Sequence, residues 1–194
     1  MKRLTLAALF VMVLCGGAFA HNGALSLYAD ETITVCDAGL ALFDTYNLNM
    51  YYVKDQGPDL GRAAEFRLLR SSSAALLQAP TWSPKINLTL GDLESGISIT
   101  SNECIGPGET ISYIGTIPVM SLGDPDTFTV RVVRHPATLP APAIRITVCD
   151  PTNPLADVLG GTFIFNGDPN PANWLHCNPG VHSTSWGAIK SLYR

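Results

Sequence analysis

Residues 64–68 read Ala-Glu-Phe-Arg-Leu, and this stretch decides the fold class. Apolar and charged side chains alternate along it, so Ala64, Phe66 and Leu68 share one face of an extended chain. Residues 60–69 also have good helix propensity, which makes a helix the alternative. Because the charges alternate instead of gathering on one helical face, we predict a strand with one buried face.

The same alternation recurs in short runs along the chain. Each run is rich in β-branched and aromatic residues and is bounded by Gly, Pro, Asn or Asp, which is typical of a strand. The other runs are 24–28, 48–53, 86–90, 97–100, 110–117, 127–133, 144–149 and 162–165. About eight to nine strands at this short spacing predict an all-β protein, an antiparallel β-sandwich.

The N-terminus has the three parts of a secretory signal peptide. Residues 1–3 read Met-Lys-Arg, residues 4–14 are uncharged and mostly apolar, and an A-x-A cleavage site ends at Ala20. The apolar run is too short for a membrane helix of roughly 20 residues. We therefore expect cleavage after Ala20, a secreted protein and no membrane span. Cys15 offers the alternative of a lipoprotein, although Leu14 stands before it where a small residue is expected.

Length and charge limit the classes of partner. The chain has 194 residues, which suits a signal peptide at 1–20 and one sandwich domain at 21–166. We assign 167–194 to a C-terminal loop and tail, because the proline-rich residues 166–171 cannot hold a central strand. The formal net charge is −4, and no run of Lys and Arg occurs. This acidic balance argues against nucleic acid or anionic lipid as the partner.

Four cysteines remain after signal cleavage: Cys36, Cys104, Cys149 and Cys177. An even number in an exported chain indicates two disulfides. No C-x-x-C occurs, which argues against a thioredoxin-type redox pair and against a zinc ribbon. Four cysteines can pair in three ways. Among these we favour Cys36–Cys104 with Cys149–Cys177.

Signal cleavage would make His21 the first residue, with an α-amine and an imidazole on the same residue. That pair can chelate Cu(II) in a square plane when a second histidine approaches. Secreted β-sandwich polysaccharide oxygenases and periplasmic copper carriers have a copper site of this kind. The second ligand would be His135, His176 or His182. The alternative is a frayed chain end, since no spacing singles out a partner histidine.

A possible calcium site lies near the C-terminus. Asp168, Asn170 and Asn173 place oxygen ligands two and three residues apart, which suggests calcium, although Asx residues beside proline also form ordinary turns.

The last ten residues form a separate unit. Trp186, Ile189 and Tyr193 fall at i, i+3 and i+7 behind a Ser185 cap, which predicts a short amphipathic helix. So short a helix is marginal by itself and buries its apolar side chains only against another surface. That surface is either a partner, which would make the tail a docking or sorting element, or the sandwich itself.

Four aromatic residues could form a platform on which sugar rings stack. They are Trp82, Trp174, Tyr51 and Tyr52. One of the two neighbouring tyrosines must face outward if their run is a strand. The alternative for Trp82, which lies among prolines, is packing over the end of a sheet.

A series of segments extends over nearly the whole mature chain: 23–30, Cys36, 64–68, 96–99, Cys104, 148–149, 160–166 and the terminal Trp-Gly-Ala-Ile-Lys-Ser-Leu-Tyr-Arg at 186–194. The series resembles a group of uncharacterised secreted proteins from environmental bacteria, and its terminal segment is the most specific part. That group implies no activity. The strand order is more loosely similar to cohesin-like and other immunoglobulin-like sandwiches. This second resemblance implies a binding, adhesion or spacer module, by analogy of fold alone.

Catalytic motifs have little support in the sequence. No Gly-x-Ser-x-Gly elbow occurs, and no glycine-rich phosphate loop follows a strand. We therefore expect a non-enzymatic interaction or cell-surface module without a cofactor, whose partner is a protein or a glycan. The alternatives are a copper-binding protein or oxygenase that uses His21, and a carbohydrate-binding module.

Overall fold

The computed structural model describes residues 23–54, 59–123, 126–138, 143–152 and 154–167. These residues form strands and no helix, so the prediction of an all-β protein is confirmed. The described part of the chain holds no helix long and apolar enough to cross a membrane. The strands are β1 (Ala24–Tyr28), β2 (Asp37–Ala38), β3 (Thr45–Val53), β4 (Leu60–Arg70), β5 (Ala75–Leu77), β6 (Thr81–Trp82), β7 (Ile86–Asp92), β8 (Gly96–Ser101), β9 (Ile111–Ser121), β10 (Phe128–Arg134), β11 (Ile144–Val148), β12 (Leu155–Gly160) and β13 (Thr162–Phe165).

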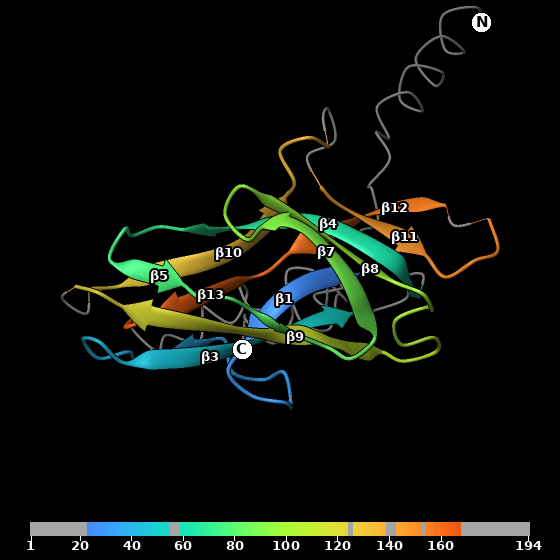
Figure 1. Ribbon diagram of the computed structural model, residues 1–194. Coiled ribbons are helices and arrows are strands. Elements are labelled where there is room, and N and C mark those ends of the chain that lie inside the picture. The colour runs from blue at the N-terminus through green and yellow to red at the C-terminus, as the bar shows by residue number, and fades with distance from the viewer. Residues whose placement is uncertain (1–22, 55–58, 124–125, 139–142, 153, 168–194) are drawn as a thin grey trace, which may run out of the picture.

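The strands form two layers (Figure 1). In the first layer β1 pairs with β3, β3 with β9, and β9 with both β5 and β6. In the second layer β4 is central, with β8 and then β7 on one edge and both β10 and β11 on the other. β13 and β2 follow β10, and β12 follows β11. The layers join where β12 runs parallel to β1.

The core lies between the two layers and is filled from both. Leu27 and Leu48 come from the first layer, and Phe66, Val130 and Phe163 come from the second; all five are fully buried. Burying each such side chain contributes about 1.5–3 kcal/mol. The alternation at residues 64–68 therefore corresponds to a buried face, with Ala64, Phe66 and Leu68 pointing inward, and the strand itself is longer, at 11 residues.

The disulfide pairing predicted from the sequence is wrong for Cys104. Its Sγ bonds to Cys149 at 2.05 Å, across 45 residues of sequence. The start of β4 explains this pairing, because the backbone N–H of Ile105 donates to Gly61 O and that of Cys149 donates to Asp59 O, each at 3.1 Å. Both cysteines are thus held beside the same short segment. Cys36 is also disulfide-bonded.

Candidate functional site

Strand β7 is an exposed edge of the second layer. In the described part of the chain it pairs only with β8. All six residues from Asn87 to Asp92 are exposed, and they include Leu88 at 50% and Leu90 at 60%. Apolar side chains this exposed are more informative when they lie together than when scattered.

The register of β7 places both leucines on the outer face. Leu88 lies opposite Thr100 and Leu90 lies opposite Ser98, whereas Thr89 lies opposite the core residue Ile99. Because side chains alternate along a strand, the two leucines point away from the core. They form an apolar pair on the outside of the sandwich.

The turn that follows β7 is firmly anchored. Asp92 Oδ1 accepts hydrogen bonds from the backbone N–H of Ser95 at 2.7 Å and of Glu94 at 3.0 Å. These bonds, first of all that from Ser95, lower the pKa of Asp92. Leu93 is buried, and its carbonyl accepts from the Leu68 N–H at 2.6 Å. The β7–β8 hairpin is therefore held to β4 at its tip, which leaves the edge of β7 exposed on a fixed support.

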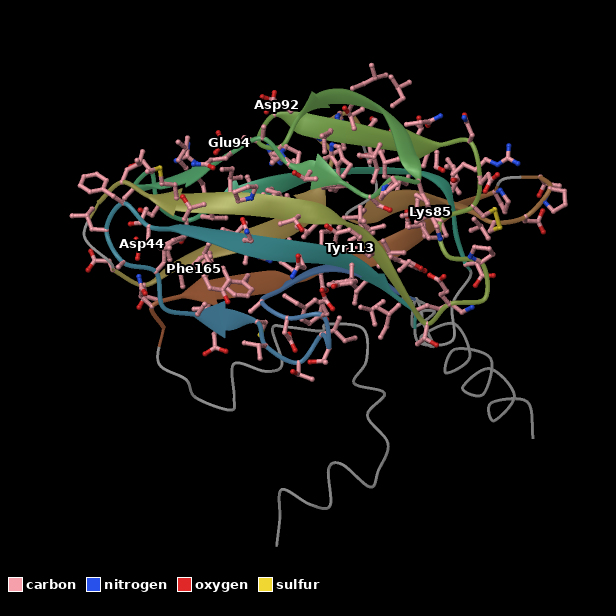
Figure 2. The ribbon with its side chains drawn as sticks, turned by 60° about the horizontal axis from the view of Figure 1, so that its bottom comes forward. Asp44, Lys85, Asp92, Glu94, Tyr113 and Phe165 are labelled. Carbon is pink, nitrogen blue, oxygen red and sulfur yellow. A yellow bond between two sulfur atoms is a disulfide. The ribbon has the colours of Figure 1, made fainter. Side chains whose placement is uncertain are left out.

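A groove of about 530 Å³ lies beside this edge. Leu77 and Trp82 line it from the first layer, and Thr89 and Asp92 from the β7 side. Figure 2 shows Asp92 and Glu94 at one end of β7, where the acidic rim of the groove lies. The groove thus combines apolar walls with polar and acidic groups, as ligand and partner sites do.

Arg70 connects three segments near the same groove. Its Nε donates to Glu94, which lines the groove, and its guanidinium also donates to the carbonyls of Ser73, at 3.1 Å, and Ala75. Three segments, the end of β4, the hairpin tip and the loop before β5, are joined in this way.

The predicted sugar platform does not form around Tyr51 and Tyr52. Tyr52 points into the core, where burial raises its pKa to about 12. Tyr51 lies on the outer side, but it is only 6% exposed, because its ring packs between Tyr28 at 6.2 Å and Tyr113 at 5.5 Å. One of the two tyrosines does face outward, as alternation predicted, but its ring is covered by neighbouring rings and is not free to stack on sugar.

Trp82 packs on the protein, as the alternative interpretation predicted, but against the core beside the middle of β9 and not over the end of a sheet. It pairs with Gly115 on the core side of β9, and its ring meets Phe66 edge-on at a centroid distance of 6.4 Å. It is half-buried where β6 pairs along the edge of β9, and it lines the groove beside β7. It is thus not brought together with Tyr51.

His135 has a structural role at the end of β10. Its Nδ1 accepts from the Ala137 N–H at 3.1 Å, and its carbonyl accepts from the Thr138 N–H at 3.1 Å and hydroxyl at 2.6 Å. Within the ranges that the structure describes, no group of three or more His, Cys, Asp or Glu residues is placed to hold a metal ion. The remaining predicted site residues lie outside these ranges: His21, Asp168, Asn170, Asn173, Trp174, His176, Cys177, His182, Trp186, Ile189 and Tyr193.

Sequence reasoning missed Leu88 and Leu90 as site residues. The run 86–90 did predict a strand, and β7 confirms it. The alternation also predicts one apolar face, but it does not say whether that face is buried. A strand whose apolar face points outward has the same pattern as one whose apolar face is buried.

Neither a family model nor a curated protein matches this sequence. Among solved structures, the chain is similar to the cohesin module of a family 33 glycoside hydrolase from Clostridium perfringens, with a TM-score of 0.55 and 9% identity over 76% of this chain and 99% of that module. A non-cellulosomal cohesin from Archaeoglobus fulgidus gives a TM-score of 0.47 and 9% identity over 80% of this chain and 98% of that one.

The fold is therefore that of a cohesin-like β-sandwich, as the looser resemblance implied. At 9% identity the likeness establishes the architecture alone.

Proposed function

We propose that this protein is a secreted, non-enzymatic interaction module that binds an extended segment of a partner protein along β7. The observation that carries the proposal is the edge itself: six consecutive exposed residues that include Leu88 and Leu90. The cohesin-like architecture supports a binding module, because a sandwich of this kind can present its loops and strand edges to a partner without any catalytic centre.

An exposed strand edge presents unpaired backbone N–H and C=O groups that can pair with another chain. Edge strands of natural proteins are usually protected by lysine, by proline, by charged side chains that point inward, or by being very short. Residues 86–91 of β7 read Ile-Asn-Leu-Thr-Leu-Gly and contain no charge and no proline. The edge is partly protected by an irregular register between Ile86 and Leu88 and by a positive φ of 90° at Gly91. The three residues between these points, Leu88, Thr89 and Leu90, remain able to pair with a partner strand.

A partner strand added here would gain two kinds of contact. Its backbone would hydrogen-bond to β7, and alternate side chains would meet Leu88 and Leu90 on the outer face. The adjacent groove, with Trp82 on its wall, offers a pocket for a side chain that points to the opposite side. Backbone pairing supplies the affinity and the alternate pockets supply the selectivity.

A display library of random extended peptides tests the proposal with the purified mature protein. Binders of the wild type should lose at least tenfold in affinity against a Leu88→Lys/Leu90→Lys variant and against Thr89→Pro, which distorts the edge. The matched control is Leu155→Lys, since Leu155 is equally exposed, at 63%, but lies on β12. Amide hydrogen exchange should show new protection on β7 when peptide is bound.

Two outcomes would overturn the proposal. One is that selected peptides bind the Leu88→Lys/Leu90→Lys variant as tightly as the wild type. The other is concentration-dependent dimerisation through β7, seen by analytical ultracentrifugation in the wild type and lost in that variant, which would assign the edge to a second copy of this chain.

A further inference from the structure

A second cleft lies beside β4, at the point where its pairing changes from β10 to β11. β10 pairs with residues 66–70 of β4, whereas β11 pairs with residues nearer its start, from Leu60 to Glu65. The two strands therefore follow each other along one edge of β4, and residues of both strands line the cleft. This cleft has a volume of about 330 Å³ and is bounded by the end of β12 on its far side.

The lining of this cleft carries positive charge and no negative charge. Arg67 reaches it from β4, and Arg131 and Arg134 reach it from β10, while the other lining residues are apolar or glycine. This is a local reversal of sign in a protein with a formal net charge of −4.

Arg67 and Arg131 lie on the same outer face. Arg67 is opposite Val133 and Arg131 is opposite Leu69, so the two arginines are diagonal neighbours across the β4–β10 pair. Diagonal neighbours of an antiparallel pair are roughly 7–8 Å apart, within reach of two long side chains. An arginine side chain carries a positive charge on its planar guanidinium group. A group placed between them would therefore meet two cations.

The charges of these two arginines are not balanced within the described ranges. Arg67 Nε is buried and has no hydrogen-bond partner, and neither arginine makes one of the ion pairs found there. An unsatisfied buried donor is costly, and more so when it is charged. Such a donor beside a cleft is what a site for an anionic group requires.

The carboxylates on the same face have other partners. Glu65 Oε1 accepts from the Ser98 hydroxyl at 3.4 Å, and Asp157 lies 4.0 Å from the Nε of Arg145. Neither carboxylate lines the cleft.

We propose that this cleft binds the carboxylate of an acidic protein segment, held between Arg67 and Arg131. Arginine is suited to a carboxylate because its planar fork can donate two parallel hydrogen bonds. The apolar lining, with Leu69 and Val133, fits the aliphatic part of a glutamate or the residues beside it. A sugar acid is disfavoured because the lining contains no aromatic ring on which a sugar could stack. The site is separate from β7 and does not depend on the function proposed for that edge.

The experiment uses an array of peptides with a fixed central glutamate and varied apolar flanks, beside the same peptides with glutamine. The wild type should bind the best glutamate peptides at least tenfold more tightly than their glutamine partners. Arg67→Gln and Arg131→Gln should each remove this preference. Arg62→Gln is the matched control, because Arg62 is exposed on the same strand but does not line the cleft. In the NMR spectrum, the Nε–H signal of Arg67 should shift on binding the glutamate peptide.

Arg131→Gln keeps the test informative if Arg67→Gln fails to fold, since Arg131 is exposed. The Leu88→Lys/Leu90→Lys variant is included and should bind the glutamate peptides unchanged, so that failure at β7 is distinguished from failure at the cleft. Equal binding of glutamate and glutamine peptides would overturn the inference. So would binding of polygalacturonate but of no peptide.

Discussion

Asn166 and Leu40 form two reciprocal hydrogen bonds across 126 residues of sequence. The Leu40 N–H donates to Asn166 Oδ1 at 2.7 Å, and Asn166 Nδ2 donates to Leu40 O at 3.0 Å. Asn166 has a φ of 51°, in the left-handed region that asparagine tolerates better than most residues. Its own N–H donates to Ala38 O at 2.9 Å. This one residue therefore ties the end of β13 to the chain that follows β2.

Replacing Asn166 should destabilise the sandwich markedly. Asn166→Ala removes two side-chain hydrogen bonds and places a less tolerant residue at a positive φ, for a combined loss of about 2–4 kcal/mol. Asn166→Gly should lose less, because glycine accepts this backbone conformation. Urea unfolding measures both, with Asn87→Ala, at an exposed position of β7, as the control. Equal stability of Asn166→Ala and Asn87→Ala would show that the two bonds contribute nothing.

Gly160 is a position where no side chain fits. A Cβ there would overlap the carbonyl oxygen of Val132 and lie 2.7 Å from its carbon, both of them backbone atoms that cannot move aside. Gly160→Ala should therefore cost about 2–3 kcal/mol or more, as overpacking does. Gly39→Ala is the matched control, because its nearest atom, Asn166 Oδ1, would be at 3.9 Å. Thermal unfolding should show a large drop in Tm for the first variant alone.

Nine strands could be predicted from the sequence because each has a run of alternating residues. Residues 64–68, for example, become part of β4 with the predicted face inward. Four strands were missed, and they are β2, β5, β6 and β12. β2 and β6 have two residues each, too few to show a period, and β12 reads Leu-Ala-Asp-Val-Leu-Gly without alternation. Their extended conformation comes from pairing with neighbours and not from their own composition.

The candidate sites were less accessible to sequence reasoning than the fold. Arg67 was visible only as the outward charge of a strand, and its position relative to Arg131 depends on the β4–β10 register. Alternation predicted that one of Tyr51 and Tyr52 faces outward, and Tyr51 does, yet neighbouring rings cover it. Alternation gives the direction of a side chain, whereas exposure depends on what packs beside it.

The bond between Cys104 and Cys149 should contribute strongly to stability. Closing a loop across 45 residues restricts the unfolded chain, and the chain-entropy relation gives about 4 kcal/mol at 25 °C. The Cys104→Ser/Cys149→Ser variant should therefore unfold at a much lower urea concentration. Single replacement of Cys104 is the less suitable test, because it leaves a reactive thiol on its partner. An unchanged midpoint in the double variant would contradict the prediction.

The partner of Cys36 can be predicted by elimination. Cys36 is disulfide-bonded, and Cys104 and Cys149 are bonded to each other. Once a signal peptide has been removed, Cys177 is the cysteine that remains. We therefore expect a Cys36–Cys177 bond, which would attach the C-terminal region beside β2. Non-reducing peptide mapping of the exported protein should yield one cross-linked peptide that contains both residues, and free thiol at either position would refute the pairing.

The loop after β1 should make stability depend on pH in the acid range. Burial by itself raises the pKa of Asp30. Hydrogen bonds from Thr32, Thr34 and Val35 have the opposite and larger combined effect, so the pKa falls from 3.8 to about 2. The folded state thus holds the ionised carboxylate more strongly than the unfolded state does. Its stabilising contribution is complete above about pH 4 and is lost as the pH falls toward 2.

Asp30→Asn tests this dependence directly. The variant should be less stable than the wild type at pH 7, and the difference should shrink between pH 4 and pH 2 because protonation removes the advantage of the native carboxylate. Asp126→Asn is a suitable control, since this carboxylate is exposed and makes no ion pair within the described residues. Urea unfolding at a series of pH values measures the difference for both variants. A difference that stays constant from pH 7 to pH 2 would mean that the hydrogen bonds of Asp30 do not depend on its charge.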